Sequence, residues 1–192
     1  MKKLIFGVGL NDADYVVRPT VGGVQKAMCP YYRKWTNMLQ RCYDTNYQKR
    51  QTTYTGCEVC DEWKTFSKFR AWMETQDWKD KELDKDFLIK GNKLYSPERC
   101  CFISKQVNNF CLHKRGRKGE EMLGVCTRKG VKRDTFVAFG TCKDKTLNLG
   151  TFKTEIEAHK AWKTNKHTQA LLLAEQQSDL RIVNILRNLY TD

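Results

Sequence analysis

Basic side chains gathered between residues 128 and 145 are the clearest candidates for chemistry in this sequence, and that chemistry is the binding of a polyanion. They are Arg128, Lys129, Lys132, Arg133, Lys143 and Lys145. A ribbon of β-strands that enters the major groove of DNA can use Arg and Lys to read guanine edges or to hold phosphates. The alternative is an ordinary solvated antiparallel sheet without a nucleic-acid partner.

The net charge of the 192-residue chain favours the same class of partner. Lys and Arg number 35 against 22 Asp and Glu, a formal charge of +13. From Cys111 to His167 there are 14 Lys and Arg against 6 Asp and Glu. Because each neutralised phosphate releases counterions, a nucleic acid is the natural partner. At 40% hydrophobic residues the chain is too rich in core-forming side chains to be a disordered tail.

The nine cysteines raise the question of a zinc site. Cys57 and Cys60 have the C-x-x-C spacing, and Cys42 or the adjacent Cys100 and Cys101 could complete four ligands. A structural zinc site usually has a second C-x-x-C or an H-x-x-x-H pair. We therefore expect these cysteines to be reduced thiols that pack as small apolar groups, with zinc unlikely.

Helical spacing dominates from about residue 29 to residue 110. One apolar stripe at i, i+3, i+4 and i+7 comprises Trp35, Met38, Leu39 and Cys42. A second stripe comprises Val59, Trp63, Phe66, Phe69 and Met73. Two apolar runs, residues 87–89 and 94–95, flank a Gly-Asn pair and predict a hairpin. Ser104 predicts the cap of a further helix, whereas residues 1–28 predict irregular structure and short strands.

The period changes to that of strands after a basic segment without apolar periodicity. Residues 113–121 are predicted to be a linker, which separates domains at residues 1–112 and 122–192. β-prone runs at 123–127, 135–139 and 147–152 precede a helix with a capping-box pattern, Thr154 and Glu157. A last amphipathic helix covers residues 182–189. We therefore expect an α+β protein whose C-terminal part is a three-stranded antiparallel sheet packed on one helix.

The C-terminal motifs carry a family resemblance. Residues 123–125 read Leu-Gly-Val, residues 136–138 Phe-Val-Ala and residues 149–152 Leu-Gly-Thr-Phe. In this order and spacing the stretch 123–166 resembles the Apetala/ethylene-response-factor DNA-binding domain. The resemblance implies a sheet laid in the major groove, with Arg128 and Phe136 at matching positions on it. Cys126 stands where that family often has Arg, which leaves the base preference open.

The N-terminal motifs resemble a second family. Residues 83–86 read Leu-Asp-Lys-Asp and residues 91–100 Gly-Asn-Lys-Leu-Tyr-Ser-Pro-Glu-Arg-Cys. They follow a Trp-x-x-Met-Leu-x-Arg-Cys-Tyr stretch at 35–43 and a Val-Cys-x-x-Trp-x-x-Phe-x-x-Phe stretch at 59–69. Together these resemble phage HNH (ββα-metal) homing-type endonucleases, which often carry the DNA-binding domain just described. The resemblance implies a ββα-metal module with flanking helices.

In that family an Asp and a distal His or Asn hold one Mg²⁺ or Mn²⁺, and a His beside the Asp activates water. The resemblance places Asp84 at the Asp position and Asn108, or Asn109, at the distal ligand. Lys85 stands where the general-base His belongs, Arg99 stands where the middle Asn belongs, and Asp86 could serve as the base instead. A Lys with a pKa of about 10.4 is a poor base at neutral pH. The plain alternative is that Asp84 and Asp86 are turn carboxylates.

Two functions follow from these resemblances. The first is a metal-dependent endonuclease for duplex DNA, and the second is a catalytically decayed DNA-binding regulator or host-takeover protein. RNA binding, with Phe136 and Phe139 stacking on bases, is a weaker third possibility. The chain has no apolar run of the ~20 residues that a membrane span needs, and no signal-peptide pattern at its start. We therefore expect a cytoplasmic protein.

Overall fold

The structure is a computed structural model that describes residues 3–112, 121–130, 133–142 and 145–191. The chain is an α+β protein made of two compact units, Met1–Asn109 (unit 1) and Phe110–Asp192 (unit 2). Helix α4 (Lys105–Cys111) runs across this boundary. The predicted linker at 113–121 lies outside the described residues except for Glu121.

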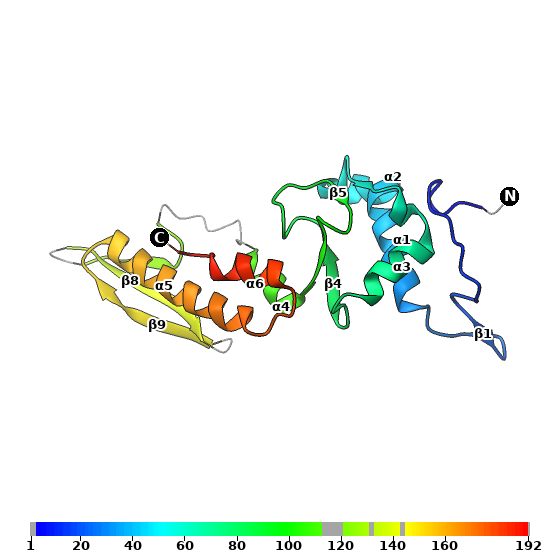
Figure 1. Cartoon of the computed structure of the whole chain (residues 1–192). Helices are drawn as coiled ribbons and strands as arrows, with labels where there is room; N and C mark the ends of the chain where they lie inside the picture. Colours follow the sequence, from blue (N-terminus) through cyan, green and yellow to red (C-terminus); the bar gives the residue numbers. More distant parts are fainter. Residues whose placement is uncertain (1–2, 113–120, 131–132, 143–144, 192) are drawn as a thin grey trace. The chain divides into compact units, whose positions relative to one another are not determined.

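Unit 1 packs helices against several short strands (Figure 1). Its helices are α1 (Pro30–Tyr43), α2 (Thr45–Arg50), α3 (Phe66–Glu74) and α4, with short 3-10 turns η1 (Thr52–Tyr54) and η2 (Glu62–Lys64). Its strands are β1 (Thr20–Val21), β2 (Val24–Gln25), β3 (Glu58–Val59), β4 (Lys81–Asp84), β5 (Leu94–Tyr95) and β6 (Cys101–Ser104). They form three separate pairs, β1–β2, β3–β5 and β4–β6.

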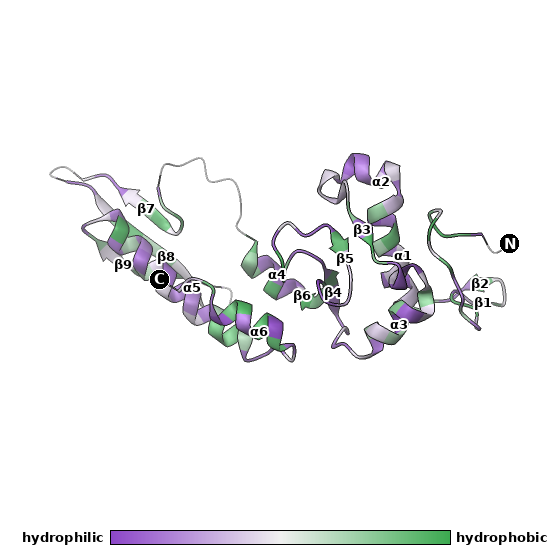
Figure 2. Cartoon of the chain, turned by 45° about the horizontal axis from the view of Figure 1, so that its top comes forward, coloured by the Kyte–Doolittle hydropathy of each residue, from purple (hydrophilic) through white to green (hydrophobic). Residues whose placement is uncertain are grey.

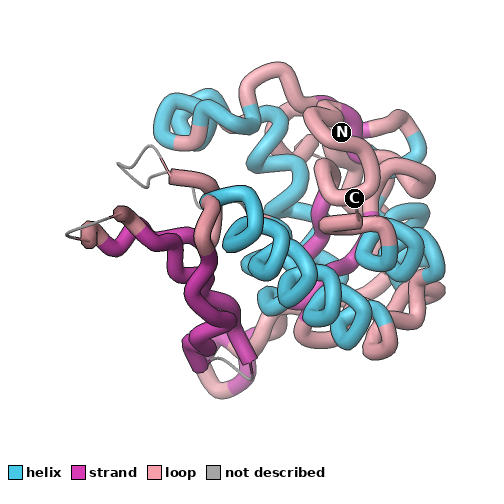
Figure 3. Tube along the Cα trace, turned by 90° about the vertical axis from the view of Figure 1, so that its left-hand side faces the viewer, coloured by secondary structure: helices cyan, strands magenta, loops and turns pink. Residues whose placement is uncertain are grey.

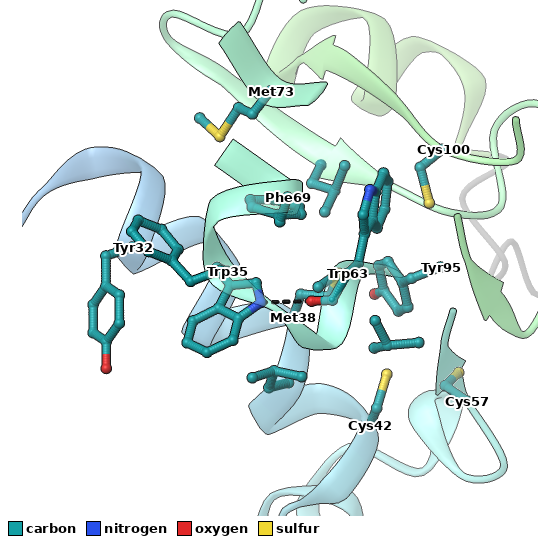
Figure 4. Packing of buried hydrophobic residues seen from close by; sticks show 14 of the residues in the cluster. Tyr32, Trp35, Met38, Cys42, Cys57, Trp63, Phe69, Met73, Tyr95 and Cys100 are labelled. Atoms are coloured by element: carbon teal, nitrogen blue, oxygen red, sulfur yellow. Dashed lines mark hydrogen bonds between the residues drawn. The ribbon is translucent and has the colours of Figure 1, made fainter. Parts of the chain in front are cut away.

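The core of unit 1 is built from aromatic side chains. Trp35 is fully buried on α1, and its indole N–H donates to the backbone carbonyl of Trp63 over 2.6 Å, as Figure 4 shows. Phe66 and Phe69 of α3 are also buried within this cluster. The stripe predicted on residues 35–42 is the buried face of α1, which begins at Pro30. This core holds the loops between the strands in place.

Two predictions for unit 1 need correction. The second stripe does not lie on a single helix, since Trp63 is in the turn η2 and α3 begins only at Phe66. The hairpin predicted around Gly91-Asn92 is also wrong. Residues 87–89 form no strand, and β5 pairs in parallel with β3. The antiparallel pair is instead β4 with β6, in which Asp84 faces Cys101.

The pair β4–β6 and the helix that follows form a strand–strand–helix unit. Strand β4 is joined to β6 by the long connection 85–100, called loop 85–100 here although it contains the two-residue strand β5, and α4 begins directly after β6. The Ser104 hydroxyl accepts a hydrogen bond from the Val107 amide over 3.2 Å, so the predicted helix cap is confirmed. Val107 itself is fully buried. The loop 85–100 and one face of α4 are therefore held beside the end of β4.

Unit 2 is a three-stranded antiparallel sheet covered on one face by a long helix (Figure 3). Its elements are β7 (Val125–Arg128), β8 (Thr135–Cys142), β9 (Lys145–Phe152), α5 (Glu155–Ala174) and α6 (Leu180–Arg187). The predicted capping box is present, since Thr154 and Glu157 exchange side-chain and backbone hydrogen bonds. A bulge interrupts the β8–β9 register between Ala138 and Phe139. The predicted sheet and helix are thus confirmed.

The sheet meets α5 through small residues. Val125, Ala138 and Ala158 form the buried cluster between sheet and helix. Gly124 has φ +80°, and a β-carbon there would lie only 1.9 Å from the Trp162 ring. Glycine therefore lets the start of the first strand pass directly over that indole. Within the described residues of unit 2, no helix covers the other face of the sheet (Figure 3).

Candidate functional site

One surface pocket of unit 1 gathers four of the five residues that the sequence nominated for catalysis and metal binding, namely Asp84, Lys85, Asp86 and Asn108. It is lined by Arg41, Tyr54, Glu82, Leu83, Asp84, Lys85, Asp86, Tyr95 and Asn108. These come from α1, η1, β4, β5, α4 and the start of the loop 85–100. Three carboxylates, two cations and an amide thus share one pocket. Such a mixture suits a divalent cation together with a phosphate.

Asp84 ends strand β4 and is fixed by the turn that follows it. Its Oδ1 accepts hydrogen bonds from the backbone amides of Asp86 and Phe87, each over 2.7 Å. This side-chain turn is the physical reason why the chain bends away after β4 instead of continuing toward a hairpin. Oδ2 makes no hydrogen bond with the described part of the chain, so it is available to a ligand in the pocket.

Lys85 is held as an ammonium ion. It is only 5% exposed, and its Nζ donates to both carboxylate oxygens of Asp86, each over 2.6 Å, and to the carbonyl of Asn92 over 2.9 Å. An ammonium group has three protons to donate, and these three bonds use all of them. A general base needs an unprotonated lone pair. In this arrangement Lys85 is therefore a structural cation rather than a base.

Asn92 closes the same loop from the other side. Its Nδ2 donates to the carbonyls of Lys85 over 2.8 Å and Leu94 over 2.7 Å, and the residue is 6% exposed. Sequence analysis assigned the middle-Asn position to Arg99. Arg99 is exposed, does not line the pocket and reaches only Asn92 Oδ1, over 3.4 Å. The residue that braces the loop is Asn92, which the sequence showed only as half of a turn pair.

Arg41 belongs to the Trp-x-x-Met-Leu-x-Arg-Cys-Tyr stretch at 35–43, but no role in the site was predicted for it. Its guanidinium carbon lies 5.3 Å from the centre of the Tyr54 ring, and Nη1 donates to the carbonyl of Leu83 over 3.4 Å. Burial raises the pKa of Tyr54, and the neighbouring Arg41 charge opposes that rise. Arg41 therefore places a positive charge beside the end of β4. Only a tertiary contact between α1 and β4 brings it there, so no local pattern could reveal it.

Helix α4 contributes Asn108 to the pocket, whereas Asn109 is exposed and does not line it. Of the two amides that the resemblance left open, Asn108 is the one that lines the pocket. Mg²⁺ prefers oxygen ligands and usually takes one or two carboxylates while keeping several waters. Asp84 Oδ2 and the side-chain carbonyl of Asn108 are donors of that kind. Asp86 is less suitable, because both of its oxygens accept from Lys85.

The described part of the chain has no preformed metal site made of three or more acidic, His or Cys side chains, and this includes the carboxylates of the pocket. Cys57 is buried in the aromatic core of unit 1, and Cys60 packs against it. Burial raises the pKa of both thiols. In these positions they pack as apolar groups.

The basic residues of unit 2 cluster around the sheet. Arg128, Lys129, Arg133 and Lys145 are exposed. Lys129 lies 3.7 Å from the Asp134 carboxylate, with its own side chain 88% exposed. Lys132 and Lys143 lie outside the described residues.

The strand registers show which face each of these side chains occupies. Cys126 pairs with Val137 and Arg128 pairs with Thr135, on the face opposite the buried cluster. Phe136 pairs with Thr127 and packs against the buried cluster on the helix side, so it does not offer its ring on the open face. Phe139 is 37% exposed and follows the opposite alternation. It is the aromatic side chain of β8 that the open face presents.

Comparisons of the chain with protein-family models, with curated proteins and with solved structures found no match. None of the helices in the described ranges is both long enough and apolar enough to cross a membrane.

Proposed function

We propose that the protein binds duplex DNA through the open, basic face of the unit 2 sheet and that the pocket of unit 1 hydrolyses the DNA backbone with Mg²⁺ or Mn²⁺. The observation that carries this proposal is the convergence of Asp84, Asp86 and Asn108 with Arg41 in one pocket at the end of the strand–strand–helix unit. The resemblance of the same residues to HNH endonucleases supports it.

The role of each side chain follows from its position. Asp84 Oδ2 and Asn108 would hold the cation, which when bound stabilises the charge that develops on the leaving oxygen. Arg41 faces the same pocket and would hold a phosphate oxygen, because a guanidinium binds phosphate through directed hydrogen bonds. Asp86 is 52% exposed and would accept a proton from water once Lys85 moves away from it. Asn92 positions the loop and touches no substrate.

A second function, DNA binding without cleavage, is favoured by the bonding of Lys85. All three of its protons are donated to Asp86 and Asn92, so the position expected to hold a base holds a locked cation. Asp86 is neutralised by the same ion pair. In that state the pocket binds a cation and a phosphate but lacks a group that activates water. The protein would then act as a DNA-binding regulator.

Nicking of supercoiled DNA distinguishes the two functions. The wild type is incubated with Mg²⁺ or Mn²⁺ beside Asp84→Asn, which keeps an oxygen for the turn hydrogen bonds but removes the charge, and Asp61→Asn, a surface control whose side chain is 96% exposed. An endonuclease predicts nicking that Asp84→Asn abolishes and Asp61→Asn preserves. A regulator predicts no nicking by the wild type, with nicking gained in Lys85→His. Absence of nicking in every protein, Lys85→His included, contradicts the catalytic ancestry of the pocket.

DNA binding itself is tested by its salt dependence. Each phosphate contact adds about 0.9 to the slope of log K against log salt. The double change Arg128→Ala and Arg133→Ala should therefore lower the slope by roughly 2 and weaken binding. The matched control is Lys49→Ala with Lys68→Ala, two exposed lysines of unit 1. An unchanged slope in the sheet variant would show that this sheet does not contact DNA. An RNA duplex that competes better than DNA would show that RNA is the preferred partner.

A further inference from the structure

A small hairpin near the amino end of unit 1 has no part in the pocket described above. The N-terminal hairpin (residues 17–29) consists of β1 and β2, in which Thr20 pairs with Gln25 and Val21 with Val24. Gly22 and Gly23 form its two-residue turn with φ of +58° and +77°. Positive φ at both positions is the requirement of a type I′ turn, whose twist matches that of the strands. The hairpin is therefore a well-formed local structure.

The base of the hairpin is closed by backbone hydrogen bonds within it, and Val17, Met28 and Cys29 pack against the buried cluster of unit 1. The Cys29 amide donates to the carbonyl of Val17 over 2.8 Å, and the Lys26 amide donates to the carbonyl of Pro19 over 2.8 Å. Just before the hairpin, the Tyr15 ring lies 5.4 Å from the guanidinium carbon of Arg70 on α3. The anchored base holds the tip away from the helices (Figures 1 and 2).

The tip is apolar and exposed, which folding alone does not explain. Val21 is 60% exposed and Val24 is 61% exposed, and as cross-strand partners they stand side by side on one face. All four strand residues are exposed. On a two-stranded ribbon this pair adds little to stability, because both side chains stay largely in water. Their burial becomes favourable when a partner covers them.

The charges beside the tip indicate the chemistry of that partner. Arg18 precedes β1 and Lys26 follows β2, both are exposed, and neither forms a side-chain hydrogen bond or ion pair with the described residues. From Tyr15 to Cys29 the sequence contains no Asp or Glu. The hairpin thus has one cation on each side of its apolar tip, Arg18 and Lys26. This surface is complementary to a polyanion that also has an apolar patch.

We infer that the N-terminal hairpin is a second DNA-reading element, which enters the major groove so that Val21 and Val24 contact thymine methyl groups while Arg18 and Lys26 hold phosphates. The inference rests on the proposed function, because it assumes that the chain binds duplex DNA. A two-stranded ribbon fits the major groove, which is about 12 Å wide, and not the minor groove of about 6 Å. The thymine C5-methyl is the apolar group that the major groove presents.

The test compares thymine with uracil, which differ by that methyl group alone. Duplexes enriched from a random pool by binding to the wild-type protein are resynthesised with thymine or with uracil. Burial of one methyl-sized group corresponds to about a fourfold change in affinity. The wild type should bind the uracil duplexes about fourfold more weakly for each methyl contacted. The double variant Val21→Ser with Val24→Ser removes every methyl group of both side chains, so it should bind both duplexes equally.

The control for folding is the unfolding midpoint, which should be unchanged because neither valine belongs to the core. Arg18→Ala with Lys26→Ala should keep the thymine preference and lower the salt slope by roughly 2. Equal binding of thymine and uracil by the wild type overturns the hairpin inference and leaves DNA binding by the sheet intact. A thymine preference that persists in the Val→Ser variant also overturns it. Failure of the wild type to bind any duplex overturns the proposed function and the inference together.

Discussion

The two units differ in the side chains that form their buried cores. The core of unit 1 consists of large aromatic side chains, and Trp35, Trp63, Phe66 and Phe69 are at most 1% exposed. The buried cluster of unit 2 between sheet and helix consists of Val125, Ala138 and Ala158. Its long helix α5 exposes apolar side chains such as Ile156, at 70%. Unit 2 also buries Leu173, Ile182, Val183 and Leu186 on α5 and α6, so the two units differ in the size of their buried side chains and not in whether they have a core.

This difference matches what each unit must do in the proposed function. A pocket that holds a cation and a phosphate needs side chains fixed within a fraction of an ångström, which a rigid, aromatic core provides. A sheet that lies on DNA needs a broad basic face and tolerates a thin core. The comparison indicates that the pocket is located in unit 1 and the exposed basic sheet in unit 2. The predictions below test that division.

The largest expected effect is the loss of an aromatic ring from unit 1. Trp35→Ala removes a fully buried indole together with its hydrogen bond to the carbonyl of Trp63, and should lower the free energy of unfolding of unit 1 by about 3–5 kcal/mol. Trp162→Ala in unit 2 should cost only about 2 kcal/mol, because that ring is half-buried. Urea unfolding followed by circular dichroism measures both. An equal cost in the two variants would contradict the division.

The sequence predicted those elements of the fold that depend on residues close together in the chain, and it failed where side-chain hydrogen bonds decide the structure. The stripe on α1, the capping box of α5 and the three strands of unit 2 all follow from local spacing, and the structure confirms them. The hairpin around Gly91-Asn92 failed because side-chain bonds of Asp84 and Asn92 replace the ladder that the apolar runs predicted. Local propensity does not include such bonds.

The residues of the candidate site also divide into those that the sequence predicted and those that it did not. Asp84, Lys85, Asp86 and Asn108 were nominated from sequence motifs, and the pocket brings all four together. Arg41 was missed because it reaches the pocket from a helix more than forty positions earlier in the chain. Phe136 was assigned to the open face because alternation within a strand does not say which side the helix covers.

The next prediction concerns pH, where the two units should respond with opposite signs. Burial raises the pKa of Cys42 and of Cys100 in unit 1 to about 12. An unfolded cysteine has a pKa of about 8.5, so above that pH the unfolded state loses these protons and the folded state keeps them. The stability of unit 1 is thus fully present below about pH 8.5, and it should fall as the pH rises, by up to about 1.4 kcal/mol per pH unit for each thiol.

Lys166 gives unit 2 the reverse slope. Burial lowers its pKa, while its Nζ lies 3.6 Å from the centre of the Phe110 ring. Below about pH 10.4 the unfolded state therefore binds more protons than the folded state, and stability rises with pH toward that value. Unfolding between pH 8.5 and 10 should show unit 1 weakening and unit 2 strengthening. Cys100→Ala should reduce the first slope and Lys166→Met should remove the second, and slopes of equal sign would refute the argument.

The smallest expected effect tests how the helices begin. Unit 2 caps its helix α5 with Thr154, whose side chain accepts from the Glu157 amide over 3.2 Å. In unit 1 the cap residue of α3 is Thr65, whose side chain makes no cap hydrogen bond. The Ser67 amide donates instead to the carboxylate of Asp12 over 2.9 Å. Thr154→Ala should therefore lower the stability of unit 2 by about 1 kcal/mol.

The matched change Thr65→Ala occupies the same cap position and should leave the stability of unit 1 nearly unchanged, because it removes no cap bond. Thermal unfolding measures the pair, and a 1 kcal/mol loss corresponds to a shift of about 4–8 °C for a unit of this size. If Thr65→Ala costs as much as Thr154→Ala, then unit 1 relies on local bonds as unit 2 does. If neither change costs anything, α5 is held by its packing on the sheet, and the contrast between the units lies in the size of their core side chains alone.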